Sequence, residues 1–119
     1  YLDKHPNNIY ALFLQYKIYC SMEETLHADA LGDICDQQLD KIQQLLETTT
    51  LNDTKFTSKI EHSIGRVRFK QGKFFESETH LIKATELDPE NIEYQFSLAT
   101  LYATNGIQIA FKYVHILTN

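Results

Sequence analysis

The stretch from Ser58 to Asn91 constrains the fold of this 119-residue chain more than any other segment. Its apolar and small residues recur every three or four positions on both sides of the short polar segment Lys70-Gln71-Gly72-Lys73, and this spacing places them on one face of an α-helix. Those positions are Ile60, Ile64 and Val67 before the segment, and Phe74, Ser77, Leu81 and Ala84 after it. The pattern predicts two helices joined by a turn, at which Gly72 takes positive φ. Leu87-Asp88-Pro89 ends the second helix, because proline has no backbone N–H.

Gly65 lies inside the first of these predicted helices, where a glycine is less favourable than alanine by about 1 kcal/mol. Two helices approach closely only if a side chain at their crossing is very small. We therefore expect Gly65 to pack against the second helix near Ser77 and Leu81.

Residues 58–91 resemble one tetratricopeptide repeat, a helix-turn-helix unit of 34 residues. The chain departs from the usual pattern at Arg68, where an aromatic residue is usual and is found one place later, at Phe69. It departs again at Ser77, where alanine is usual. The residues that carry the resemblance are Ile64-Gly65, Lys70-Gln71-Gly72, Phe74, Ala84, Leu87-Asp88-Pro89 and Asn91. The resemblance implies an all-α, right-handed superhelix of about three antiparallel helix pairs, the first with a lengthened second helix.

An internal match extends this reading to the rest of the chain. Leu2-Asp3 and Pro6-Asn7-Asn8 echo Leu87 to Asn91, and aligning Pro6 with Pro89 places Phe13 on Phe96. We therefore expect a single helical domain over residues 1–119, with repeats at about 6–57, 58–91 and 92–119, as a segment of a longer array. The expected helices of the outer repeats are Ile9 to Met22, about Leu26 to Glu47, Asn91 to Thr104 and Ile107 to Leu117, with a new helix near Thr54 and a turn at Asn105-Gly106.

Composition excludes several classes of protein. Four glycines and two prolines are few for this length and favour helices over many short strands, and no apolar run reaches the roughly 18 residues of a membrane span. Cys20 and Cys35 have no partner motif, which argues against a disulfide framework or a zinc site. We expect an intracellular protein, in the cytoplasm, without a membrane partner.

The sequence predicts no catalytic site, cofactor or metal. The five histidines include no pair four residues apart, and Gly72-Lys73 lacks the Ser or Thr that follows the lysine of a phosphate-binding loop. The carboxylate pairs Glu23-Glu24 and Glu76 with Glu78 lie near predicted helix starts, where they complement the helix dipole.

In tetratricopeptide repeats the first helix of each pair lines a concave groove that binds extended peptides or partner helices. By position, the groove of this chain is expected to contain Tyr10, Phe13, Leu14, Lys17, Lys59, His62, Ser63, Arg66, Phe69, Lys70, Glu93, Phe96, Ser97 and Thr100. Because its middle is basic and has aromatic neighbours, it suits an acidic peptide with one or two hydrophobic anchors. The competing interpretation is a solvated helix face without a partner.

Two other partners are disfavoured by the residues. Tetratricopeptide repeats that capture chaperone C-terminal tails hold the tail with a clamp of lysine, asparagine and arginine residues. At the corresponding positions this chain has Phe13, Lys17, Ser63, Glu93 and Ser97, which do not form the clamp. Residues 1–54 carry three basic and nine acidic side chains, giving −6, and residues 55–119 carry eight basic and seven acidic, giving +1. An acidic first half would repel the phosphates of nucleic acids.

The last predicted helix offers an alternative role. It is apolar nearly all round, so it needs cover on more than one face. The chain could therefore serve as a structural segment between repeats, or form a homo-oligomer through this helix. The residues expected at such a contact are Ile107, Ile109, Phe111, Val114 and Ile116.

Overall fold

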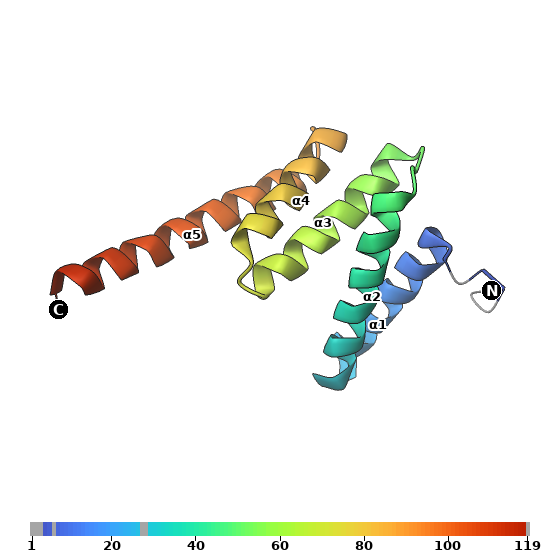
Figure 1. Cartoon of the computed structure of the whole chain (residues 1–119), viewed down its shortest axis with the longest axis horizontal. Helices are drawn as coiled ribbons and strands as arrows, with labels where there is room; N and C mark the ends of the chain where they lie inside the picture. Colours follow the sequence, from blue (N-terminus) through green and yellow to red (C-terminus); the bar gives the residue numbers. More distant parts are fainter. Residues whose placement is uncertain (1–3, 6, 27–28, 119) are drawn as a thin grey trace. The chain divides into compact units, whose positions relative to one another are not determined.

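The fold is described from a computed structural model (Figure 1). The structure describes residues 4–5, 7–26 and 29–118. The description of side chains does not include residues 23–26, 29–33, 109–113 and 115–118. The described residues form five α-helices and no strand, which confirms the all-α class expected from the sequence. The chain divides into two compact units, Tyr1–Asn52 and Asp53–Asn119. None of the helices, within the described ranges, combines the length and apolar character needed to cross a membrane.

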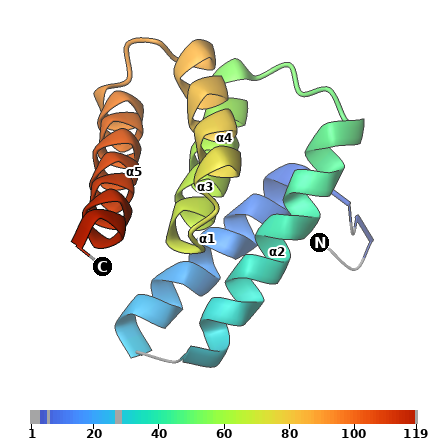
Figure 2. The same cartoon turned by 60° about the vertical axis from the view of Figure 1, so that its left-hand side comes forward.

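The first unit is a hairpin of α1 (Ile9–Leu26) and α2 (Asp29–Thr48), which lie side by side (Figure 2). The carboxamide of Asn8 accepts a hydrogen bond from the Ala11 N–H at 3.0 Å and so caps the start of α1. The side chain of Gln38 donates a hydrogen bond to that of Gln15 across the hairpin. The buried apolar residues form one stripe on each helix, namely Ile9, Leu12, Phe13 and Tyr16 on α1 and Cys35, Leu39 and Ile42 on α2.

Both helices of this hairpin differ at one end from the sequence prediction. The first continues to Leu26 instead of ending at Met22, and the second begins at Asp29 instead of near Leu26. The second helix has 20 residues against the 14 of α4 (Phe74–Leu87), the second helix of the next hairpin, so the expected lengthening of the second helix is confirmed.

Tyr16 and the two cysteines lie in this hairpin. Burial raises the pKa of the Tyr16 phenol well above its usual value, and a hydrogen bond with Cys20 adds to the shift. Cys20 is half-buried and Cys35 is buried.

The second unit starts with the hairpin of α3 (Thr54–Lys70) and α4. The Asp53 carboxylate caps α3 by accepting the Phe56 N–H at 3.0 Å. Gly72 joins the helices with a φ of 77°, as expected for a glycine that ends a helix. The second helix ends at Leu87, two residues before Pro89, which confirms that prediction.

The helices α3 and α4 cross most closely at Gly65. The Ser77 hydroxyl donates a hydrogen bond of 2.7 Å to the Gly65 carbonyl oxygen. A Cβ added to Gly65 would lie 2.7 Å from both Cγ and Cδ2 of Leu81 and 3.3 Å from its backbone nitrogen. The close packing of Gly65 against Ser77 and Leu81 that the sequence predicted is therefore confirmed.

Polar side chains also join these two helices. The buried Glu61 carboxylate lies 2.7 Å from Nδ1 of His80. The guanidinium of Arg68, buried where tetratricopeptide repeats usually have an aromatic residue, lies 3.6 Å from the Glu76 carboxylate and donates to Gln71 at 3.0 Å. Arg68 thus occupies its position through polar contacts on both sides of the turn.

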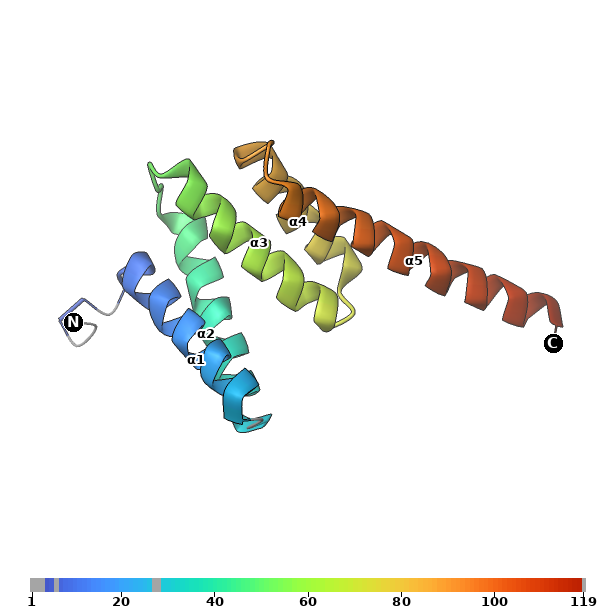
Figure 3. The ribbon, with the colours of Figure 1, turned by 180° about the vertical axis from the view of Figure 1, so that it is seen from behind.

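The last helix, α5 (Ile92–Thr118), is continuous for 27 residues, so the predicted turn at Asn105-Gly106 is wrong. The chain forms two helix pairs and one long helix instead of three pairs, and α5 extends well beyond the α3–α4 hairpin (Figure 3). The residues 34 positions after Gly65, Ser77 and Leu81 are Ala99, Phe111 and His115. The small residues of the α3–α4 crossing, Gly65 and Ser77, therefore have the larger Ala99 and Phe111 at the corresponding positions of α5.

We predict that Gly65→Ala destabilises the protein, by about 1–2 kcal/mol. Overpacking against Leu81 costs about 1–3 kcal/mol, of which the better helix propensity of alanine returns up to about 1 kcal/mol. Chemical denaturation followed by circular dichroism measures the change in the free energy of unfolding. An unchanged or raised value would contradict the close crossing.

The matched change Gly106→Ala should have the opposite sign. An added Cβ at Gly106 meets nothing within 4 Å, and the residue lies inside α5, so alanine should stabilise by up to about 1 kcal/mol and raise the helical signal. At Gly72, whose φ is positive, alanine should instead cost about 1 kcal/mol or more. Destabilisation by Gly106→Ala would indicate a turn at this position in place of a continuous helix.

Candidate functional site

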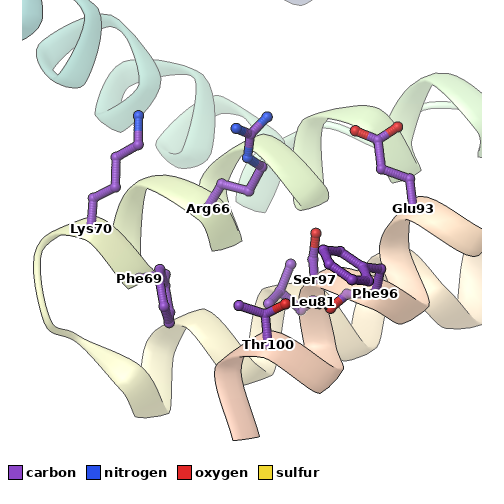
Figure 4. Close-up of a pocket in the computed structure, with 8 residues that line it drawn as sticks. All are labelled: Arg66, Phe69, Lys70, Leu81, Glu93, Phe96, Ser97 and Thr100. Carbon is purple, nitrogen blue, oxygen red and sulfur yellow. Dashed lines mark hydrogen bonds between the residues drawn. The ribbon is translucent and has the colours of Figure 1, made fainter. Parts of the chain in front are cut away.

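A pocket of about 380 Å³ lies in the second unit among α3, α4 and α5 (Figure 4). This volume is within the range of ligand-binding sites. Its lining residues are Arg66, Phe69 and Lys70 from α3, Leu81 from α4, and Glu93, Phe96, Ser97 and Thr100 from α5.

Hydrogen bonds between α3 and α5 fix the two walls of the pocket. The Ser58 and Tyr94 hydroxyls lie 3.2 Å apart, and Nε2 of His62 lies 2.8 Å from the Ser97 hydroxyl. The His62 and Tyr94 rings also pack together, with centroids 4.6 Å apart. Because the partners advance together along both helices, α3 and α5 run parallel, and Ser97 is held on the pocket wall.

Two further contacts secure α5. At its start the Asn91 carboxamide accepts the Tyr94 N–H at 3.3 Å, as Asn8 does at the start of α1. A hydrogen bond between Glu78 of α4 and Tyr102 raises the pKa of the Tyr102 phenol. The asparagines that the internal alignment paired therefore make the same cap.

The floor of the pocket is apolar. Leu81 is only 1% exposed, and it is the residue against which Gly65 packs, so the crossing of the hairpin also sets the depth of the pocket. Phe69 is half-buried against Phe74, with ring centroids 5.7 Å apart. Phe96, by contrast, is 71% exposed, so its ring is accessible to a ligand.

The charged residues of the pocket are separated by sign. Arg66 and Lys70 are exposed and four residues apart on α3, which places them one helical turn from each other. In Figure 4, Lys70 lies at one end of the pocket and Glu93 at the other, with Arg66 between them. The site therefore offers two cations beside an apolar floor, and one carboxylate at the far end.

The residues that the sequence placed in a groove fall into three groups. Arg66, Phe69, Lys70 and Phe96 line the pocket together with Glu93, Ser97 and Thr100. On the same helix Lys59 is exposed but does not line the pocket, whereas His62 is 6% exposed and bonded to Ser97, and Ser63 is also buried. Tyr10, Phe13, Leu14 and Lys17 belong to the first unit.

In the first unit, Phe13 is a core residue. It is 4% exposed, its ring packs on Tyr16 with centroids 5.7 Å apart, and the Lys17 ammonium lies 5.4 Å from the Phe13 ring centroid. Tyr10 and Leu14 are exposed on the same helix. The buried position of Phe13 leaves little of its surface for a partner.

Sequence reasoning assigned Leu81 to the helix crossing and missed that it also forms the pocket floor. The spacing on α4 does not reveal this, because a residue on the buried stripe of one helix can contact two others. Among the residues expected in self-association, Ile107 and Val114 are 57% and 55% exposed. The side chains of Ile109, Phe111 and Ile116 lie outside the described part.

Within the described residues, no three His, Cys, Asp or Glu side chains lie together in a way that could hold a metal ion. In the comparisons with known proteins, no family model, curated protein or solved structure matches this chain.

We predict that Ser97→Ala lowers the free energy of unfolding by about 1–2 kcal/mol, because the buried His62 loses a hydrogen-bond partner. The matched control is Thr100→Ala, one turn further along α5. The exposed Thr100 hydroxyl donates a hydrogen bond to the Phe96 carbonyl oxygen of its own helix, so its loss should change stability by about 0.5 kcal/mol or less. Equal effects of the two changes in chemical denaturation would contradict a structural role for the His62–Ser97 bond.

Proposed function

We propose that this chain is a protein-interaction module of the tetratricopeptide type, which binds an acidic peptide or helix with a hydrophobic anchor in the pocket of the second unit. The observation that carries the proposal is the position of Arg66 and Lys70 in one pocket with Phe96, whose ring is accessible. Exposed cations one helical turn apart can pair with carboxylates of a ligand, and the accessible ring of Phe96 can pack on its apolar side chain.

The two kinds of contact have different roles. Burying one Leu or Phe side chain of a ligand contributes about 1.5–3 kcal/mol, whereas an exposed ion pair contributes about 0.2–1 kcal/mol. The anchor therefore supplies most of the affinity, and the cations select the ligand and accelerate its association.

The tetratricopeptide assignment has local support. A 34-residue segment contains a hairpin that crosses at a glycine, ends at Leu87 before a proline and is followed by an asparagine cap. The segment around Asn8 repeats this cap. The first and second helix pairs would then be two repeats of an array, followed by α5 as the first helix of a third.

Self-association is the second candidate, and the exposure of Ile107 on the long helix α5 favours it. A helix with a large apolar side chain in water gains free energy when another molecule covers that side chain. This function would not need Arg66 or Lys70, which separates it from peptide binding.

We predict that the double reversal Arg66→Glu and Lys70→Glu weakens the binding of acidic peptides by about tenfold or more, since two attractions become repulsions. The measurement is fluorescence anisotropy with labelled twelve-residue peptides that carry several Asp or Glu residues and one Leu or Phe. Lys83→Glu, an exposed lysine of α4 outside the pocket, is the matched control and should leave the affinity unchanged.

Equal losses in the control and the double reversal, or no binding by any peptide of the panel, would contradict the proposal. Concentration-dependent dimerisation in analytical ultracentrifugation, unaffected by the reversal and without peptide binding, would support self-association instead. Tight binding of an RNA oligonucleotide whose affinity falls steeply with salt would indicate a nucleic-acid site.

A further inference from the structure

We infer that the pocket recognises a dipolar, extended peptide, in which an acidic residue lies at the Arg66–Lys70 end, a large apolar side chain packs on Phe96, and a basic residue lies at the Glu93 end. This inference rests on the proposed function and narrows its ligand. It starts from the one acidic residue of the lining, Glu93, for which a purely acidic peptide offers no favourable contact.

The parallel register of α3 and α5 gives the separation of the charges. Ser58 faces Tyr94 and His62 faces Ser97, so Glu93 lies close to the level of Ser58. Arg66 follows Ser58 by eight residues and Lys70 by twelve. At a rise of 1.5 Å per residue, the backbone of Glu93 is therefore offset from that of Arg66 and Lys70 by roughly 12 Å and 18 Å along the helices.

The charged groups of Glu93, Arg66 and Lys70 do not pair with one another. Within the described part of the chain, none of Arg66, Lys70 and Glu93 takes part in an ion pair. Opposite charges held apart along an apolar floor present a potential that changes sign from one end of the site to the other. A ligand is complementary to this potential if its negative charge lies at the Arg66–Lys70 end and its positive charge lies at the Glu93 end.

The offset also sets the spacing within the ligand. An extended chain advances about 3.3 Å per residue, so 12–18 Å corresponds to roughly four or five residues between the acidic and the basic side chain. A helix of about 10–12 Å diameter would rest only one face on a site of this size, whereas an extended segment can direct its central apolar side chain onto Phe96.

Lys59 bears on the strength of this recognition. It is exposed on α3 one residue after Ser58, and so lies near the level of Glu93 without lining the pocket. Its charge reduces the attraction of Glu93 for a basic ligand residue. Removing the charge of Lys59 should therefore strengthen the preference of the Glu93 end for a basic ligand residue.

The test uses three labelled peptides that carry one Asp, a central Leu and, five residues after the Asp, either Lys, Gln or Glu. Binding to the full chain is measured by fluorescence anisotropy at low salt. We expect the affinities to fall in the order Lys, Gln, Glu, with about threefold or more between the first and the last. Glu93→Gln should remove this order, Glu93→Lys should reverse it, and Lys59→Gln should widen it.

Equal affinities of the three peptides for the wild type, or an order that Glu93→Lys leaves unchanged, would overturn the inference. If acidic peptides then still require Arg66 and Lys70, the proposed function stands although the inference about a dipolar ligand fails. A failure of all three peptides to bind would contradict both the inference and the proposed function. Since Glu93 lies in the first turn of α5, Glu93→Lys can lower helix stability, and the isosteric Glu93→Gln provides the second variant. Circular dichroism shows whether each variant is folded.

Discussion

The crossing of α3 and α4 at Gly65 is the contact on which the second unit depends. There the Ser77 hydroxyl reaches the Gly65 carbonyl oxygen, and the backbone of Leu81 lies within 3.3 Å of where a Cβ would be. A Cβ at position 65 would have to displace the Leu81 side chain, whose Cγ and Cδ2 lie 2.7 Å away, and would also press on the Leu81 backbone nitrogen. The same displacement would move Leu81, and with it the floor of the pocket.

The attachment of α5 follows a different physical rule. Apolar burial is non-directional and does not by itself fix how far one helix slides along another. Paired polar groups fix this position along the helix axis, because each hydrogen bond has a narrow range of distance and angle. The Ser58–Tyr94 and His62–Ser97 pairs thus set the register of α3 and α5, and this register places Glu93 far from Arg66.

Local signals made much of the fold predictable. The glycine crossing, the cap at Asp53 and the end of α4 at Leu87 each depend on residues close in sequence, whose backbone preferences are strong. The turn at Asn105-Gly106 failed because glycine permits a turn without requiring one. Whether the chain turns there depends on tertiary packing, which is decided by residues far from the glycine.

The candidate site was predictable only as a helical stripe. Spacing placed His62 and Arg66 on one face of α3, but it could not show that α5 covers the first and leaves the second exposed. Nor could spacing place Phe13 in the core of the first unit. Burial along a stripe changes within one turn wherever a neighbouring helix ends or crosses, and the sequence does not record that point.

The separation of charges in the pocket has a consequence for how selectivity would arise. At physiological ionic strength the Debye length is about 8 Å, which is less than the backbone offset of roughly 12–18 Å that separates Glu93 from Arg66 and Lys70 along the helices. Each end of the pocket then interacts with a ligand nearly independently of the other. In the proposed complex, affinity from the anchor on Phe96 and the two charge contributions would be nearly additive, so each end could change its preference without loss of the other. If the proposed binding holds, a single hairpin with one added helix would be sufficient to distinguish ligands that share an anchor and differ in the order of their charges.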